Sequence, residues 1–208
     1  VTSAAYVLAQ TSKIRVGTAI MQMPARTPAM CAMTAMSLDQ LSDGRFIVGL
    51  GASGPQVVEG WHGVPYGKPV TRTKEYIQIM RKIFEREGPV EFDGQMYQMP
   101  NQSEGTTRLG KPLKSILAAA SDIPIYTASI TPAGLRCAGE VADGVFPVWM
   151  DPNKYDVLGE SIEQGFEKAG NGKSLKDFDV APFVTVAMND DLDAAYDALR
   201  PWLALSIG

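Results

Sequence analysis

The chain has 208 residues, of which 45% are hydrophobic, and its formal net charge at pH 7 is −4. This composition is typical of a globular protein with a real core, and the scattered lysines and arginines argue against nucleic acid or an anionic membrane as a partner. Without a run of about 18 apolar residues or a charged-then-apolar leader, the sequence predicts a cytoplasmic protein with no transmembrane helix. Cys31 and Cys137 lie far apart in apolar helical patterns, which favours reduced core residues over a metal site or a disulfide.

The first quarter of the chain predicts the order strand, helix, strand. Residues 1–11 have the pattern of the end of a helix, and residues 16–20 form an apolar strand. Residues 29–41 carry apolar side chains near helical spacing, and Asp43-Gly44 supplies the stop. Residues 46–50 have the length and composition of a strand that is buried on both faces.

Glycines follow this strand in the spacing G-x-G-x-x-G, at Gly49, Gly51 and Gly54. Because glycine has no β-carbon, backbone N–H groups here can face an anionic or planar group at close range. A dinucleotide-binding fingerprint also needs a helix that starts on the glycines, and Pro55 with the glycines and prolines beyond it interrupts that pattern. The spacing alone therefore favours a plain turn over a dinucleotide fingerprint.

Residues 51–70 predict a long irregular loop, too long for a simple connector and hence a candidate functional segment. The loop contains His62, the single histidine of the chain. A solitary loop histidine is more typical of a surface or packing residue than of a catalyst.

The next segment predicts a helix followed by an antiparallel hairpin. Thr71 or Thr73 can cap a helix that runs to about residue 85 and has one apolar face. Residues 90–99 alternate between apolar and polar about an Asp-Gly pair, which is a strong hairpin signal. Residues 101–122 indicate a loop with one short helical turn.

The alternation of strands and helices then resumes with residues 123–128 as a strand. Thr131 is placed as the N-cap of a helix that has Pro132 at its first position and runs to about Ala142. The free N–H groups and positive dipole end of this helix then face the mouth of the strand. Such an arrangement is typical of a phosphate site.

The last part predicts two further strands, each followed by a helix. Residues 145–149 form a strand, and Asp151-Pro152 opens a helix that Asn171-Gly172 closes. Residues 180–188 form the next strand, and Asp190 caps a final helix that Pro201 kinks or restarts.

Five strands joined through four helices predict a parallel sheet covered by helices. A five-stranded doubly wound sheet and part of an eight-stranded barrel both fit this order, although a complete barrel needs about 250 residues. The chain begins at Val1 and ends at Gly208 within two residues of an apolar helix, so both ends look truncated and the barrel is favoured. In either architecture, ligands bind where the strands end.

Several motifs, in order, resemble the bacterial luciferase-like monooxygenase superfamily, and most closely its actinobacterial oxidoreductases that use coenzyme F420. These motifs are KIRVGTAI at 13–20, LDQLSDGRF at 38–46, G-x-G at 49–51, IPIY at 123–126 and AGEVADG at 138–144. The resemblance implies an α/β fold of the (β/α)8 TIM-barrel type. It implies that residues 1–208 are a single barrel domain, truncated at both ends and holding about the third to seventh strands, with insertions at 51–70 and 88–122.

The resemblance also implies a cofactor site. It places a non-prolyl cis peptide at the Ala19-Ile20 bond behind the ring, Gln22 beside the ring, a loop along the cofactor and a phosphate site before the capped helix. The loop consists of Gly51, Ala52 and Ser53, and the phosphate site of Ser129, Ile130 and Thr131. Ser42-Asp43-Gly44-Arg45 is assigned to structure at the opposite end of its strand. The family's acid/base residues come from its first strands, so no catalytic residue is assigned, and no metal is expected.

Three functional hypotheses remain open. The first is hydride transfer between coenzyme F420 and a small organic substrate. The second is an FMN-dependent monooxygenase that uses molecular oxygen. The third is an inactive fragment or a non-catalytic cofactor-binding module. The resemblance also makes a homodimer plausible.

Overall fold

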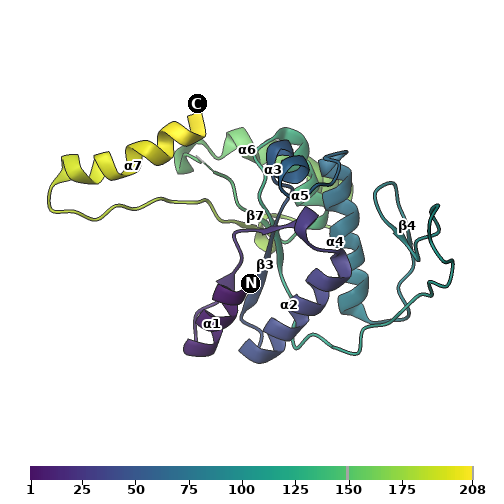
Figure 1. Cartoon of the computed structure of the whole chain (residues 1–208). Coiled ribbons are helices and arrows are strands. Elements are labelled where there is room, and N and C mark those ends of the chain that lie inside the picture. Colours follow the sequence, from purple (N-terminus) through teal and green to yellow (C-terminus); the bar gives the residue numbers. More distant parts are fainter. Residues whose placement is uncertain (149, 208) are drawn as a thin grey trace.

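The computed structural model describes residues 1–148 and 150–207. Its centre is a parallel sheet with the strand order β1-β3-β6-β7-β8, in which β2 also pairs with β3 (Figure 1). The strands are β1 (Val16–Gly17), β2 (Met21–Gln22), β3 (Phe46–Gly51), β6 (Ile125–Thr127), β7 (Gly144–Val145) and β8 (Asp179–Val180). The pairings within this sheet are parallel, as the alternation of strands and helices predicts.

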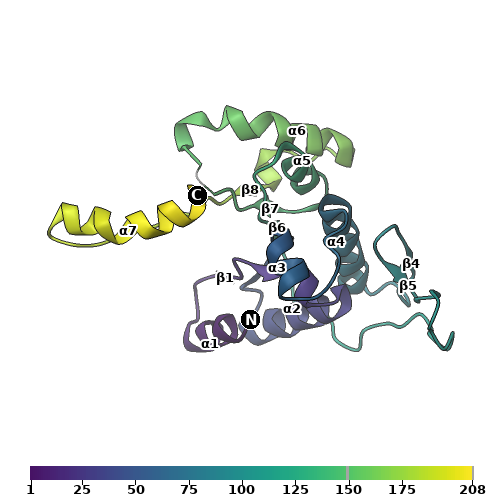
Figure 2. The ribbon, with the colours of Figure 1, turned by 45° about the horizontal axis from the view of Figure 1, so that its top comes forward.

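Helices cover the outside of this sheet. They are α1 (Thr2–Gln10), α2 (Pro28–Ser42), α4 (Pro69–Glu85), α5 (Pro132–Val141) and α6 (Asp156–Ala169), with the short α3 (Pro55–Gly60) after β3. Helices α1, α2, α4, α5 and α6 contact one another in that order, and Figure 2 shows them following the curve of the sheet. This arrangement is an α/β fold that forms part of a (β/α)8 barrel.

The core is built from the central strand and the helices beside it. Phe46, Val48 and Leu50 of β3 are fully buried together with apolar side chains of α2 and α4. A second cluster joins α5, β7 and α6 through residues such as Leu135 and Ile162. Since β3 is buried along its length, the apolar run at 46–50 predicts this strand correctly.

The cap signals explain why several helices begin and end where they do. The side chain of Thr27 accepts a hydrogen bond from the Met30 N–H and Pro28 holds the first helical position, so α2 begins here. At its other end, Asp43 lies in the left-handed region with φ of 55° and Gly44 with φ of 77°, which confirms the predicted stop.

Arg45 has the structural role that the sequence predicts. Its guanidinium donates hydrogen bonds to the backbone oxygens of Leu8 at 3.0 Å, Thr11 at 3.0 Å and Ile14 at 2.9 Å. These carbonyls belong to the last turn of α1 and the segment after it. The positive charge therefore satisfies the C-terminal carbonyls of α1.

The hairpin at residues 90–99 is confirmed and is anchored by a buried carboxylate. Strands β4 (Phe92–Asp93) and β5 (Gln98–Met99) are antiparallel, and the turn spans residues 94–97. Glu75 of α4 accepts hydrogen bonds from the N–H groups of Gln95, Met96 and Tyr97 at 2.7 to 3.0 Å. That residues 51–70 and 88–122 are insertions in one domain stays a prediction.

The strand predicted at residues 16–20 is interrupted. Strands β1 and β2 flank a bulge at Thr18, Ala19 and Ile20, and the Ala19-Ile20 peptide bond is cis, as the resemblance implies. The last backbone bond before the bulge joins the Thr18 N–H to the Ile47 carbonyl oxygen at 3.3 Å. The Thr18 hydroxyl replaces the ladder, because it bonds both the N–H and the carbonyl oxygen of Gly49.

Three predictions for the middle of the chain are wrong. Residues 51–70 are not wholly irregular: Gly54 acts as the N-cap and Pro55 as the first residue of α3, because the fixed φ of proline suits a helix start. For the same reason α4 begins at Pro69, before the predicted threonine caps. Residues 101–122, all of which the structure describes, contain no helical turn. They form a loop in which Leu113 makes an isolated antiparallel bridge with Val90.

The last third also differs from the sequence prediction. Strand β7 ends at Val145, and residue 149 lies outside the described residues. Helix α6 follows a 3-10 turn at Pro152–Lys154 and ends at Ala169, with Gly170 as its C-cap before the predicted stop at Asn171-Gly172. Strand β8 covers only Asp179–Val180 of the predicted range 180–188. Beyond it, the N–H groups of Ala181 and Phe183 still bond the carbonyl oxygens of Val145 and Pro147, and the chain then leaves the sheet.

The final helix, α7 (Leu192–Ile207), lies apart from the sheet at the end of a long connecting segment (Figure 1). The predicted Asp190 cap is wrong by one residue, since Asp191 accepts the Asp193 N–H. Among the described residues, no helix is long and apolar enough to cross a membrane.

Candidate functional site

A cavity of about 200 Å³ lies where β3 and β6 end and α5 begins. Five residues that the resemblance assigns to the cofactor line it together: Gly51, Ala52, Ser129, Ile130 and Thr131. Tyr66, Val70 and Thr73, from the segment after α3 and the start of α4, line the same cavity. Its position at the carboxyl ends of parallel strands is where α/β proteins place their ligands.

The floor of this cavity contains a buried hydroxyl that lacks a partner. Thr127 is the last residue of β6, its side chain is only 2% exposed, and it lines the cavity. Its Oγ1 makes no hydrogen bond within the part of the chain that the structure describes. Because buried hydroxyls in proteins are nearly always paired, this atom points to a ligand group in the cavity.

The first turn of α5 forms another wall. The Thr131 side chain accepts a hydrogen bond from the Gly134 N–H at 3.2 Å, which confirms the predicted N-cap. At Gly134, a β-carbon would lie 3.1 Å from the side chains of Ser129 and Thr131, so glycine leaves the space between them open. An open helix N-terminus with two hydroxyls beside it suits an anion such as phosphate.

The strand bulge lies directly against the glycines of β3. A β-carbon at Gly49 would come within 1.7 Å of the Thr18 carbonyl oxygen, and one at Gly51 within 2.2 Å of Ile20 Cδ1. Gly49 is therefore required by the backbone of the bulge, whereas a side chain at position 51 would have to displace only the end of the Ile20 side chain. The glycine spacing alone does not reveal either contact.

The other predicted site residues, Ala19, Ile20, Gln22 and Ser53, are not among the residues that line the cavity. Gln22 pairs with Gly51 in the register of β2 and β3, and Ile20 packs on Gly51. Ser53 follows Ala52 in the left-handed region, with φ of 63°. Ala19, at the cis bond, is exposed. Gln22, Ile20 and the cavity therefore meet around the end of one strand.

Sequence reasoning missed the contact of His62. The ring Nε2 of His62 lies 2.7 Å from Oε1 of Gln22, and the histidine side chain is half-buried. The single loop histidine is thus joined to the strand that carries the bulge. No spacing signal in the sequence links these two residues, which are 40 positions apart.

Cys137 is the cysteine of the cavity wall. It is buried and forms no disulfide, its thiol lies 3.8 Å from the Val70 carbonyl oxygen, and burial, followed by the nearby Glu140, raises the pKa of its thiol to about 11. The thiol therefore stays protonated near neutral pH, which agrees with the predicted reduced core residue. The described residues hold no group of three or more His, Cys, Asp or Glu side chains that suits a metal ion.

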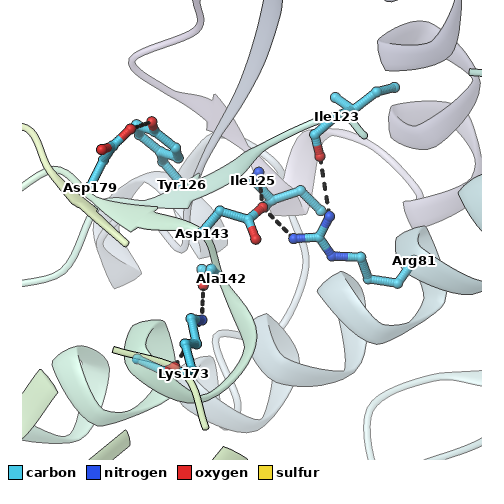
Figure 3. Close-up of polar contacts among 9 residues, drawn as sticks. Arg81, Ile123, Ile125, Tyr126, Ala142, Asp143, Lys173 and Asp179 are labelled. Atoms are coloured by element: carbon cyan, nitrogen blue, oxygen red, sulfur yellow. Dashed lines mark hydrogen bonds and ion pairs between the residues drawn. The ribbon is translucent and has the colours of Figure 1, made fainter. Parts of the chain in front are cut away.

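A different polar cluster lies at the amino ends of the strands, which are the ends away from the cavity (Figure 3). Asp143, just before β7, pairs with Arg81 of α4 and accepts the Ile125 N–H at 2.7 Å, while Arg81 also donates to the Ile123 carbonyl. Lys173 donates to the carbonyls of Ala142 and Gly139 at the end of α5.

A separate pair lies beside this cluster: the Tyr126 hydroxyl bonds Asp179 of β8, whose backbone N–H bonds the Asp143 carbonyl oxygen at 3.0 Å. Burial and this hydrogen bond raise the pKa of Tyr126 to about 12. The groups of the cluster bond backbone and one another at the amino ends of the strands. We therefore assign the cluster to stability, as is usual for that face of a barrel.

Comparison with known proteins agrees with this geometry. Residues 1–206 match the model of the luciferase-like monooxygenase family, and the chain belongs to that family. It is 44% identical, over 95% of its length, to a putative coenzyme F420-dependent oxidoreductase of Mycobacterium tuberculosis, of which it covers 57%. It is 30% identical to a 5,10-methylenetetrahydromethanopterin reductase of Archaeoglobus fulgidus, covering 92% of this chain and 53% of the relative.

Comparison with solved structures also supports this family and fold. The coenzyme F420-dependent tetrahydromethanopterin reductase of Methanopyrus kandleri superimposes with a TM-score of 0.79 and 27% identity, over 97% of this chain and 60% of the other. The chain thus spans between half and two thirds of the length of these relatives.

Proposed function

We propose that the protein is an oxidoreductase that transfers a hydride between coenzyme F420 and a small organic substrate. The observation that carries the proposal is the cavity at the start of α5, with the unpaired Thr127 hydroxyl in its floor. An enzyme that uses a phosphate-bearing coenzyme needs such an anion site at the end of its sheet.

The residues present fit the phosphate of such a coenzyme. Thr127 offers a buried hydroxyl without a partner, and Gly134 keeps the space between Ser129 and Thr131 free of a β-carbon. Each hydroxyl can donate to a phosphate oxygen, and the positive end of the α5 dipole favours the negative charge. The described residues that line the cavity include no carboxylate, which would repel an anion.

The relatives support the choice of cofactor. The Mycobacterium tuberculosis protein is named as putatively coenzyme F420-dependent, and the Methanopyrus kandleri reductase is described as coenzyme F420-dependent. We extend this dependence to the present chain because it is 44% identical to the Mycobacterium tuberculosis protein over 95% of its own length.

Each predicted site residue then has a task. Ser129, Ile130 and Thr131 would bind the phosphate, while Gly51, Ala52 and Ser53 would lie along the cofactor. The bulge at Ala19 and Ile20 would support the ring, with Gln22 beside it. When bound, the coenzyme supplies the hydride chemistry. Tyr66 from the segment after α3 and Val70 from the first turn of α4 line the cavity, so these two elements would exclude water.

Equilibrium titration with coenzyme F420 and with FMN tests the proposal. We expect saturable binding of F420, followed by its intrinsic fluorescence, and no comparable binding of FMN. Tight binding of FMN alone would replace the proposal by an FMN-dependent monooxygenase. Binding of neither would favour an inactive or non-catalytic module. A homodimer and a cytoplasmic location stay predictions, which gel filtration with light scattering and cell fractionation can test.

A further inference from the structure

The contact between His62 and Gln22 has a chemical consequence that follows from the two groups alone. A neutral imidazole has one N–H donor and one acceptor nitrogen, and the Gln22 amide has one acceptor oxygen and an NH₂ donor. His62 Nε2 and Gln22 Oε1 lie 2.7 Å apart, which is hydrogen-bond distance. Because an amide oxygen only accepts, this orientation of Gln22 requires the proton on His62 Nε2.

This pairing fixes what Gln22 can offer to a ligand. With Oε1 occupied by His62, the NH₂ group is the part of the amide that is left without a hydrogen bond among the described residues. If His62 carried its proton on Nδ1, its bare Nε2 would accept a hydrogen bond from the Gln22 NH₂ group. The Gln22 amide would then be rotated by 180°, and its oxygen would face the ligand. The histidine therefore decides whether Gln22 acts as a donor or as an acceptor.

Gln22 occupies a position where this choice matters. It is half-buried at the end of β2, directly beside the cavity residue Gly51 in the strand register, and it follows the cis bulge by two residues. His62 is held from the other side, because its backbone N–H bonds the Val57 carbonyl of α3 at 3.1 Å. Both partners of the pair are thus attached to elements that border the candidate site.

We infer that His62 is a positioning residue that holds the Gln22 amide with its NH₂ group as the donor toward a carbonyl-bearing ring at this end of the sheet. The inference rests on the proposed function and deepens it. A deazaflavin or flavin ring presents two carbonyl oxygens on its pyrimidine edge, with one N–H group between them. An amide NH₂ group fixed as the donor matches either carbonyl oxygen, whereas an amide oxygen would match only the N–H group.

The first test reads the histidine directly. Because the untagged chain has one histidine, a long-range ¹H–¹⁵N NMR spectrum contains a single imidazole pattern. We expect a proton on Nε2. A ring protonated at Nδ1 alone would overturn the inference, whatever the protein binds.

The second test uses binding of the coenzyme F420 and FMN probes. His62→Phe keeps a flat ring but removes the donor, and Gln22→Ala removes the amide. For the cofactor that wild type binds, each variant should weaken the affinity about fivefold, as expected for one lost hydrogen bond. The double variant should be no weaker than either single one, because the two residues act as a unit.

His62→Gln is the matched control, because its amide nitrogen reaches about as far as Nε2 and can donate to Gln22. It should restore affinity to within about twofold of wild type. Unchanged affinity in His62→Phe, or losses that multiply in the double variant, would overturn the inference while the proposed function stands. Failure of wild type to bind either cofactor would overturn both.

Discussion

Thr18 and Gly49 are joined by two hydrogen bonds through one hydroxyl. Thr18 Oγ1 donates to the Gly49 carbonyl oxygen and accepts from the Gly49 N–H, both at 3.0 Å. A β-carbon at position 49 would lie 1.7 Å from the Thr18 carbonyl oxygen, so only glycine allows this approach. The bulge before the candidate site therefore depends on a glycine in the neighbouring strand.

Gly49→Ala should destabilise the protein strongly. The new methyl group must displace the backbone at Thr18, and overpacking of this kind typically costs about 3 kcal/mol. Urea unfolding measures the loss. Gly60→Ala is the control, because no atom lies within 4 Å of a β-carbon there, and its stability should stay within about 0.5 kcal/mol of wild type. Equal stability of the two variants would contradict the packing described for the bulge.

Asp39→Ala should also destabilise the protein. The buried Asp39 carboxylate accepts hydrogen bonds from the Ala120 and Ser121 N–H groups at 2.6 and 3.0 Å and from Ser121 Oγ at 2.7 Å. Its removal leaves these donors without their partner and should cost about 3 kcal/mol. The measurement is the free energy of unfolding, with the exposed Asp122→Ala as control. A loss below about 1 kcal/mol would show that Asp39 is not the anchor of this loop.

Glu140→Gln should remove a pH-dependent part of the stability. Burial disfavours the charged carboxyl, but hydrogen bonds from Lys74 at 2.5 Å and Lys168 at 3.0 Å outweigh it and hold the pKa of Glu140 below its ordinary value. A lowered pKa means that the stabilisation is complete above the ordinary carboxyl range and is lost as the pH falls through the lowered value.

Wild type should therefore exceed Glu140→Gln by about 1 kcal/mol at pH 7, and this difference should vanish in acid. Unfolding by urea at several pH values measures it. The exposed Glu167→Gln should show no such dependence. A difference that stays constant down to low pH would contradict the ion-pair explanation.

The sequence predicts the sheet and its helices because their signals are local. The apolar run at 46–50 marks β3, and Thr131 with Pro132 marks the start of α5. These features need only neighbouring residues to be recognised. The same holds for Asp43-Gly44, whose positive φ angles end α2.

Other features depend on contacts between distant residues and have no local signal. The break at Thr18 depends on Gly49, which lies 31 positions away, and the His62 to Gln22 contact spans 40. The unpaired state of Thr127 is visible only when the surrounding atoms are in place. Residues 180–188 have the apolar and β-branched composition of a strand, but a strand also needs a partner, and the paired residues of β7 and β8 end at Val180.

The affinity of Thr127→Val for coenzyme F420 tests the central claim most directly. This variant keeps the shape of the side chain and removes the unpaired hydroxyl, so its free energy of unfolding should be unchanged or slightly higher. If the hydroxyl binds the phosphate, F420 affinity should fall about tenfold or more. Thr73→Val, in the same cavity but with its hydroxyl already bonded to the Pro69 carbonyl at 2.8 Å, should bind F420 nearly as wild type does. Equal F420 affinity in Thr127→Val and wild type would contradict the claim that this cavity holds the coenzyme phosphate.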